Sequence, residues 1–469
     1  MRSGPEKTGA LVLAAGKGTR MKSELPKVLV PALDQPILYY VLRTLDRCGD
    51  IFASTAAVVG HKGELVQRYI SSAWESVVPI WQHQQLGTGH AVQIAREWWT
   101  GLDNLLVLPG DVPLLTSDSL RALVERHVAD SADCSFITFS ARNPFGYGRV
   151  VRDGSSNVAS IVEERDATPE QRSLREVNSG IYIFRVSSLL PHIDRLSNEN
   201  AQGEYYLPDI IDLMIRCGMR VATVMTEWED EFRGINTQLQ LAEAVSLLRE
   251  DIVRSHLAQG VRMLDPSTVW IGPEVHLGEG AVLDPYVQLW GATTVGRGCE
   301  IGSFSILRDM QLADDVRVLS HSVLSGSSLA RGARVGPFIV IRDGAVLEEE
   351  AQAGKFVEIK KSVVGRRSKV PHLTYMGDAS VGEGSNVGAG TVTCNYDGER
   401  KHPTRIGDRC FVGSGTMLVA PVTVGNDSFI AAGSVVTSDV PEDALAVGRA
   451  RQKNIEGWAS KRKRLRKGD

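Results

Sequence analysis

The hydrophobic pattern of the C-terminal half repeats every six residues. Aliphatic side chains stand at Ile406, Val412, Leu418, Val424, Ile430 and Val436, with Gly, Ser, Asn, Asp and Thr between them. A helix repeats near 3.6 residues and a strand near 2, so this period fits neither element. It fits a three-sided coil in which each side is a short strand with one aliphatic side chain pointing inward. The pattern therefore predicts a β-helix of hexapeptide repeats.

The same period recurs earlier in the chain, because one coil cannot bury its own apolar face and coils must stack. The further positions are Ile271, Leu277, Leu283, Leu289, Val295, Ile301 and Leu307, then Leu329, Val335, Ile341 and Leu347, and then Val381 and Val387. The period slips within residues 307–329, 347–357 and 387–406. We interpret each slip as an insertion at a corner, which forms either a binding loop or a tolerated surface loop. The segment Cys394–Gly398 is rich in hydrogen-bonding groups, which favours a binding loop there.

In the N-terminal half, short apolar runs alternate with amphipathic segments. Strands are expected at Ala10–Ala14, Thr55–Val59, Val77–Trp81, Asn104–Leu108, Ser135–Phe139 and Gly180–Phe184. Helices are expected at Ile37–Arg47, Gly89–Trp99, Ser117–His127, Tyr205–Cys217 and Gln238–His256. This alternation predicts an α/β Rossmann-like domain, a mostly parallel sheet with helices on both faces. Ligands of such sheets bind beyond the carboxyl ends of the strands.

The long helical segment Gln238–His256 separates the two patterns and is expected to connect two domains. The predicted ranges are 1–236 for the α/β domain, 237–259 for a linker helix, 260–446 for the β-helix and 447–469 for a basic tail. A short disordered lead is expected before Ala10. The run Lys461–Lys467 is typical of a solvated, mobile tail, and help in holding a polyphosphate ligand is the alternative.

Composition narrows the function classes. A chain of 469 residues with 43% hydrophobic and 23% charged residues is ordinary for a soluble protein of two or three domains. A net charge of −4 argues against nucleic acid or a membrane as the main partner, and no apolar run is long enough to span a bilayer. The polar start lacks the apolar core of a signal peptide, so a cytoplasmic protein is expected. The six cysteines are scattered without a CxxC pair, which favours free thiols over disulfides or zinc.

Candidate chemistry in the first half lies in loops that follow strands. The glycine-rich turn Gly16–Arg20 could cradle phosphate oxygens with its backbone N–H groups, and Arg20 and Lys27 add positive charge. Its spacing is neither that of a P-loop nor that of a dinucleotide fold, so an ordinary turn is the alternative. The segment Gln85–Gly89 opens a predicted helix and offers further backbone donors. Asp111 ends a strand, where it could hold Mg²⁺ or simply cap a turn.

In the second half, His372 lies where the hexapeptide repeat is irregular, beside basic and tyrosyl residues. An imidazole in such a place is a candidate general base, although a structural histidine is the alternative. The other polar candidates of this half are Arg342, Lys360, Lys361, Tyr375, Asn386, Asn395, Tyr396 and Ser414.

Together, these motifs resemble a known family. Leu13–Met21, Pro26–Lys27, Gln85–Gly89, Gly110–Pro113, Gly146–Arg149 and Asn178–Gly180 are similar to the motifs of sugar-phosphate nucleotidyltransferases. With the hexapeptide half, the chain from about Gly9 to Trp458 resembles the bifunctional bacterial enzymes that combine N-acetylglucosamine-1-phosphate uridylyltransferase and glucosamine-1-phosphate N-acetyltransferase activities. The resemblance implies an α/β nucleotidyltransferase domain followed by a left-handed parallel β-helix, and a homotrimer.

For the first site, the resemblance implies a UTP and sugar pocket with Mg²⁺. The implied UTP and UDP-sugar contacts are Leu13, Ala14, Ala15, Gly16, Arg20, Lys27, Gln82, Gln85, Gly87, Thr88, Gly148, Glu163, Asn178 and Asn236, with Asp111 and Asn236 as the metal ligands. The family often has Tyr where this chain has Pro109, so one ligand contact near the metal is expected to differ here.

For the second site, the resemblance implies that His372 takes a proton from the amine of glucosamine 1-phosphate, which then attacks acetyl-CoA. The implied sugar-phosphate contacts are Arg342, Lys360, Tyr375 and Asn386, with Asn395 and Tyr396 also lining the pocket. The implied acetyl-CoA contacts are Ala389, Asn395, Tyr396, Ser414, Ala432 and Arg449.

The implied product is UDP-N-acetylglucosamine, a precursor of cell-wall polysaccharide. One alternative is a nucleotidyltransferase whose β-helix is structural or allosteric, against which His372 and Asn395–Tyr396 argue. Another is a non-enzymatic assembly subunit, against which Arg20, Lys27 and Asp111 argue.

Overall fold

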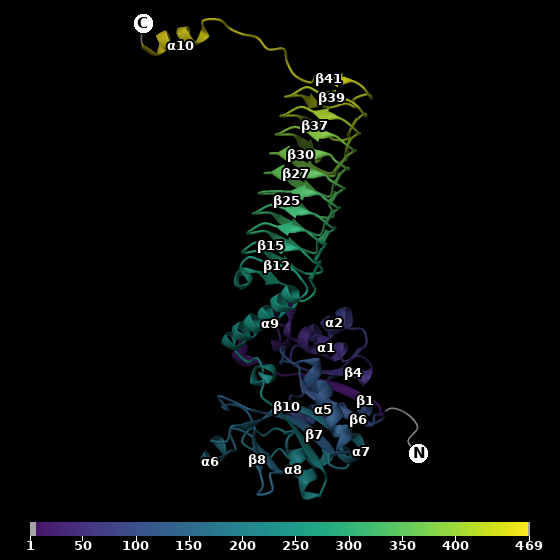
Figure 1. Ribbon diagram of the computed structural model, residues 1–469, viewed down its shortest axis with the longest axis vertical. Helices are drawn as coiled ribbons and strands as arrows, with labels where there is room; N and C mark the ends of the chain where they lie inside the picture. Colours follow the sequence, from purple (N-terminus) through teal and green to yellow (C-terminus); the bar gives the residue numbers. More distant parts are fainter. Residues whose placement is uncertain (1–5, 468–469) are drawn as a thin grey trace. The chain divides into compact units, whose positions relative to one another are not determined.

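The computed structural model describes residues 6–467, and it divides into two compact units, Met1–Leu248 and Arg249–Asp469. The division falls within α9 (Gln238–Ala258), the long helix expected from the sequence. Residues 1–5 of the expected lead and residues 468–469 of the basic tail lie outside the described residues. Each unit is described by itself below (Figure 1).

Unit 1 is built on one sheet with the strand order β11-β7-β10-β6-β1-β4-β5. Its strands are β1 (Thr8–Ala14), β4 (Phe52–Val59), β5 (Val77–Trp81), β6 (Asn104–Pro109), β7 (Cys134–Ser140), β10 (Glu176–Arg185) and β11 (Val221–Thr226). Only β10 runs antiparallel to its neighbours along this path, so the prediction of a mostly parallel sheet is confirmed. A hairpin, β8 (Arg149–Arg152) and β9 (Val158–Val162), extends from β10, and the short strands β2 (Pro31–Ala32) and β3 (Gln35–Pro36) form a separate ribbon.

Helices cover both faces of this sheet because its central strand is apolar on both sides. Along β1, Ala10 and Val12 lie in one buried cluster and Leu11 lies in the other. The first cluster is covered by α1 (Ile37–Arg47), α2 (Gly63–Ala73) and α5 (Ser117–Ala129), and the second by α3 (Thr88–Ile94), α4 (Arg96–Trp99), α7 (Val186–Leu189) and α8 (Asp209–Arg216). The short helix α6 (Pro169–Arg172) follows the hairpin.

Several boundaries differ from the sequence prediction. The helix expected at Gly89–Trp99 is two helices that break at Ala95. The helix expected from Tyr205 begins only at Asp209, because Tyr205 exchanges backbone hydrogen bonds with the loop before α3. The first strand begins at Thr8, within the expected lead. Helix α2 and strands β8, β9 and β11 were not predicted.

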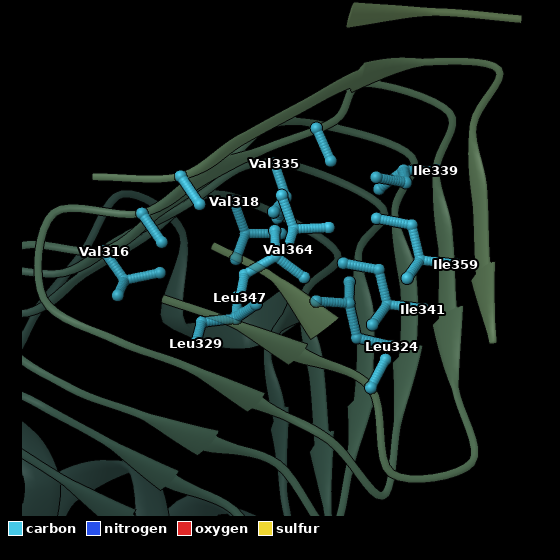
Figure 2. Close-up of a cluster of buried hydrophobic side chains, with 14 of the residues drawn as sticks. Val316, Val318, Leu324, Leu329, Val335, Ile339, Ile341, Leu347, Ile359 and Val364 are labelled. Carbon is cyan, nitrogen blue, oxygen red and sulfur yellow. The ribbon is translucent and has the colours of Figure 1, made fainter. Parts of the chain in front are cut away.

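Unit 2 contains a β-helix of three parallel sheets whose strands stack coil upon coil. Sheet 1 runs from β12 (Arg262–Met263) to β41 (Leu445–Ala446), sheet 2 from β13 (Trp270–Ile271) to β40 (Val435–Val436), and sheet 3 from β14 (His276–Leu277) to β38 (Val422–Val424). Each strand pairs with the third strand after it in almost every coil, as β15 (Val282–Leu283) does with β18 (Glu300–Ile301). The aliphatic residues at the six-residue spacing are buried inside the coils, as Figure 2 shows for Leu329, Ile341 and Leu347. The predicted parallel β-helix is confirmed, and the repeat is consistent with the left-handed form.

The interpretation of the phase slips as insertions is wrong in two of the three segments. Paired residues in the first coils lie 18 positions apart, as Leu283 and Ile301 do, but Ile301 pairs with Val318, 17 positions on. The slips within 307–329 are therefore omissions of single corner residues. Within 347–357 the phase continues, since Val335 pairs with Ala353.

The third slip is an insertion, as predicted. In sheet 3, Val381 pairs with Ile406, 25 positions on. The extra residues form a hairpin, Asn395–His402, between β34 (Val392–Cys394) and β35 (Thr404–Ile406). This insertion hairpin leaves the stacking of the coils on either side of it intact.

A ladder of aromatic rings lies along the corner between sheets 1 and 2. Its members are Tyr286, Phe304, His321, Phe338 and Phe356, each with a positive φ between 54° and 64°. Successive ring centroids lie 4.8 to 5.4 Å apart, and the four carbocyclic rings are about half exposed.

The basic tail contains a helix that the sequence analysis did not expect, α10 (Trp458–Lys467), and residues 447–466 are exposed. None of the helices within residues 6–467 has the length and hydrophobicity to cross a membrane.

Candidate active sites

A cavity of about 520 Å³ lies beyond the carboxyl ends of β1 and β6 in unit 1. The sequence candidates that line it are Leu13, Ala15, Gly16, Gln82, Gln85, Gly87, Thr88, Gly148, Glu163 and Asn178. Pro109 also lines the cavity, and Ala14 instead packs its side chain in the hydrophobic core. The sheet topology thus brings residues from four loops to one place, as expected for this kind of sheet.

The loop between β5 and α3 has a shape that requires glycine at position 87. Gly87 has φ 111°, and a Cβ there would lie 2.6 Å from the carbonyl oxygen of Tyr205. Tyr205 holds the loop by donating its N–H to the oxygen of Leu86 and accepting the N–H of Gly89, both at 2.8 Å. The loop is therefore fixed before any ligand arrives. The cavity is also lined by Glu204, Leu207 and Pro208, which the sequence analysis missed. These residues lie in the segment that contains Tyr205, and this segment carries no recognisable local motif.

Glu163, a partly buried residue, lies beside Gly148 in the lining of the same cavity. A Cβ on Gly148 would lie 3.3 Å from Glu163 Oε1, so the glycine leaves this carboxyl group open to the cavity. Burial, and then the nearby carboxylates of Asp209 and Asp166, raises the pKa of Glu163 to about 7. A carboxyl group that is protonated in part near neutral pH can both donate and accept hydrogen bonds, which suits a sugar hydroxyl.

A polar cluster next to Gly110 contains the two expected metal ligands. Lys27 Nζ donates to Asp111 Oδ2 and, at 3.2 Å, to Asn236 Oδ1, and Arg20 Nη2 donates to the same amide oxygen at 3.0 Å. Two oxygen atoms thus converge on a cationic group. Oxygen donors of this kind fit Mg²⁺, which is usually held by one or two carboxylates plus substrate phosphates. Residues 6–467 contain no group of three or more His, Cys, Asp or Glu side chains that could hold a metal ion.

In unit 2, sheet 2 carries a stack of cationic side chains. Arg342 in β25 (Val340–Arg342), Lys360 in β28 (Glu358–Lys360) and Gly377 in β31 (Tyr375–Gly377) follow one another in register. A Cβ on Gly377 would lie 2.4 Å from the Tyr375 hydroxyl and 2.8 Å from Asn395 Nδ2. Tyr375 and Asn395 therefore lie over the glycine, directly beside the two cations.

Lys401 joins this cluster, although the sequence analysis missed it. It lies on the insertion hairpin opposite Tyr396 in an antiparallel bridge. A side-chain hydrogen bond between Lys401 and Lys360, together with the charge of Lys401, lowers the pKa of Lys360. The charge of Arg342 lowers this pKa further. Arg342 also donates to Asp343 Oδ2 at 2.9 Å and to Glu358 Oε1 at 2.7 Å, and Lys360 Nζ lies 3.8 Å from Asp343 Oδ2. These carboxylates offset part of the positive charge, and a bound anion would relieve the crowding of the two lysines. The only available signal was a further basic residue a few positions beyond Cys394–Gly398.

The corner between sheets 1 and 2 brings together the candidates for the acyl donor. Gly390 N–H donates to Leu373 O, Gly415 N–H to Ala389 O and Gly433 N–H to Ser414 O, at 2.7 to 3.0 Å. These bonds stack the turns that contain His372, Ala389, Ser414 and Ala432 in one column. Arg449 ends it, with its Cδ 3.9 Å from where a Cβ on Gly433 would lie. His372, at the end of β30 (Lys369–His372), is exposed.

Asn386 is the one sugar-phosphate candidate on a different face. It belongs to β33 (Asn386–Val387) of sheet 1, between Lys369 and Phe411. Arg342, Lys360 and Tyr375 all belong to sheet 2. One copy of the chain therefore does not place Asn386 beside the cationic cluster.

Comparison with known proteins gives matches in both units. Residues 9–231 match the family model described as nucleotidyl transferase, and residues 403–438 match the model of the bacterial transferase hexapeptide. Proteins named "Bifunctional protein GlmU" are similar over almost their whole length. The relative from Fervidobacterium nodosum is 44% identical over 97% of both chains. That from Heliobacterium modesticaldum is 44% identical over 97% of this chain and 98% of its own. That from Caldanaerobacter subterraneus is 42% identical over the same shares.

Proposed function

The chain belongs to the family of bifunctional GlmU proteins, and from that premise we propose that it catalyses two consecutive reactions. Glucosamine 1-phosphate is acetylated by acetyl-CoA in the β-helix half, and the product then receives UMP from UTP in the α/β half, releasing pyrophosphate. The observation that carries this proposal is the 44% identity over 97% of both chains, which spans the cavity of unit 1 and the cationic cluster of unit 2 together.

In the first half, the phosphate of N-acetylglucosamine 1-phosphate attacks the α-phosphorus of UTP, and the bond from that phosphorus to pyrophosphate breaks. The nucleophile is already an anion, so no general base is needed, and the obstacle is the repulsion between two anions. Arg20 and Lys27 offset this repulsion, and the loop Leu13–Gly16 positions the phosphates. We propose that Asp111 and Asn236 hold Mg²⁺, which would neutralise charge on the triphosphate.

In the second half, the amine of glucosamine 1-phosphate attacks the thioester carbonyl of acetyl-CoA. His372 accepts the proton that the amine loses, and CoA leaves as the thiol after the carbon–sulfur bond breaks. Arg342, Lys360 and Lys401 hold the sugar phosphate through charge-assisted hydrogen bonds. The column of Ala389, Ser414 and Ala432 takes the acyl donor, and Arg449 its phosphates.

We propose that the protein is a homotrimer with this second site between copies. Two features support the proposal. Asn386 stands on sheet 1 and the cationic cluster on sheet 2, and two faces of a three-sided coil point in different directions. A second copy would bring sheet 1 to sheet 2. The half-exposed aromatic ladder at the corner between those sheets is an apolar surface that such an arrangement would bury.

The remaining parts of the proposal concern the domain boundaries and the location of the protein in the cell. The uridylyltransferase half is assigned to residues 1–236, the linker helix to 237–259, the acetyltransferase half to 260–446 and the tail to 447–469. The protein is proposed to work in the cytoplasm, where its small-molecule substrates are found.

One incubation tests the two activities. The protein is mixed with glucosamine 1-phosphate, acetyl-CoA, UTP and Mg²⁺, and the expected product is UDP-N-acetylglucosamine with one free CoA and one pyrophosphate each. If N-acetylglucosamine 1-phosphate is converted but glucosamine 1-phosphate releases no CoA, the β-helix is structural and the acetyltransferase assignment is wrong.

A further inference from the structure

The cavity of unit 1 contains an amide whose orientation is set by the protein. Gln82 follows β5, lines the cavity, and is only 3% exposed. Its Nε2 donates to the carbonyl oxygen of Gly87 at 3.1 Å and lies 2.9 Å from His90 Nδ1. His90 belongs to α3, one turn after the glycine.

These two contacts decide which end of the amide faces the cavity. A backbone carbonyl oxygen can only accept, so the group facing Gly87 must be the amide NH₂. The second hydrogen of that NH₂ then points at His90 Nδ1, which must accept it. His90 is thereby held as the neutral tautomer with its proton on Nε2.

The other end of the amide has no protein partner. No donor among residues 6–467 bonds to Gln82 Oε1. The atom is not fully enclosed by protein either, and because Gln82 lines the cavity, Oε1 borders it. A mostly buried carbonyl oxygen without a partner is costly, and a ligand that offers an N–H at this point gains the bond in full.

We propose that His90 is a positioning residue that makes this cavity select a nucleobase with an imide N–H, such as uracil, over cytosine. Uracil carries a hydrogen on N3 that Gln82 Oε1 can accept. Cytosine presents a lone pair on N3, which would face the amide oxygen. This inference rests on the proposed uridylyl transfer and explains how that site distinguishes UTP from CTP.

The alternative is that His90 only supports the fold, since its ring lies 6.4 Å from the ring of Tyr205, which holds the same loop. A structural role would lower activity with both nucleotides alike. A positioning role would change the ratio between them, because a rotated amide offers its NH₂ to the base and favours cytosine.

The experiment compares kcat/KM for UTP and CTP with N-acetylglucosamine 1-phosphate in full-length variants. His90→Phe keeps the ring but removes the acceptor, and His90→Asn keeps an acceptor oxygen. His83→Phe is the matched control, since His83 is an exposed residue of the same loop that stacks on Trp81. Uridylyl transfer that persists with at least one of the two nucleotides reports that unit 1 has folded.

The wild type and His83→Phe are expected to prefer UTP. In His90→Phe the UTP-to-CTP ratio is expected to fall about tenfold or more, mainly through a higher KM for UTP, with a smaller fall in His90→Asn. An unchanged ratio in His90→Phe, or a wild type without preference for UTP, overturns the inference while leaving uridylyl transfer in place. A wild type that transfers neither nucleotide refutes the proposed function itself.

Discussion

Lys27 donates its ammonium group to the carboxylate of Asp111, and the same group reaches Asn236 Oδ1. Both side chains are largely buried, with 15% and 14% of their surfaces exposed. The protein thus supplies its own cation to the two oxygen atoms proposed to ligate Mg²⁺. Nucleotide phosphates would draw the ammonium away, so metal and nucleotide are expected to enter together.

The first prediction follows from this competition. Replacing Lys27 by Gln should let free enzyme bind Mn²⁺ at least about tenfold more tightly, because the carboxylate loses its internal partner. Titration of Mn²⁺ by electron paramagnetic resonance, without nucleotide, measures this. Lys27→Arg retains a cation and should bind Mn²⁺ as weakly as the wild type, and Lys17→Gln controls for the loss of a positive charge nearby. Equal Mn²⁺ affinity in Lys27→Gln and Lys17→Gln would contradict the competition.

The second prediction concerns the carboxylate itself. Asp111→Ala should reduce uridylyl transfer by a factor of about 10² or more, because one of the two proposed metal ligands is lost. Acetyl transfer should be unaffected, since it belongs to the other unit. Rates for the two half-reactions, measured separately at saturating Mg²⁺, test this. A variant that forms UDP-N-acetylglucosamine at the wild-type rate would remove Asp111 from the site.

The third prediction concerns Lys401. Its replacement by Gln should raise KM for glucosamine 1-phosphate by about tenfold, because one charge-assisted contact to the phosphate is lost. The rate at saturating substrate should change less. Arg400→Gln is the control, since Arg400 is an exposed neighbour on the same hairpin. Steady-state acetyl transfer distinguishes the two variants, and an equal effect of both would indicate that only the overall charge matters.

The fourth prediction concerns pH and Glu163. Its pKa is about 7 in the folded protein and near 4.5 in the unfolded chain, so the folded state binds more protons between these values. The free energy of unfolding of unit 1 should therefore fall as the pH rises from 4.5 to 7. Glu163→Gln should weaken this dependence without abolishing it, because burial also raises the pKa of Asp212 to about 6. At pH 8 the variant should be more stable than the wild type by roughly 2–3 kcal/mol.

The effect is measured by urea unfolding of the full chain at several pH values. Hydrogen exchange of β9 and β10 is the signal that reports on unit 1. Glu125→Gln, at an exposed position of α5, should keep the wild-type pH dependence. Parallel pH profiles for Glu163→Gln and the wild type would mean that the carboxyl group is not strained by burial.

The sequence predicts the β-helix well because its period comes from a local rule, one inward side chain per short strand. It predicts the strands of unit 1 for a similar reason, since runs such as Ala10–Ala14 are buried on both faces. What it misses depends on contacts between distant segments. The start of α8 shifts because Tyr205 pairs with the loop before α3.

The candidate sites show the same difference between what local patterns predict and what contacts between distant segments decide. Residues within motifs, such as Gln85 and Gly87, were predicted from the sequence and lie together in the cavity. Lys401 reaches Lys360 only because the hairpin folds back on itself, and Asn386 lies on another face because its position in the coil differs by a few residues. His90 could not be found, because its role depends on which end of a neighbouring amide it meets.

The hairpin Asn395–His402 adds residues at one corner, yet Val381 and Ile406 pair as directly as any other coil neighbours. The part of the proposed substrate site that lies on this hairpin, Asn395, Tyr396 and Lys401, can therefore vary without disturbing the stacked coils. Grafting a different excursion at that corner should alter which amine is recognised without rebuilding the column beneath, which makes this segment the natural place for evolution, or an engineer, to begin.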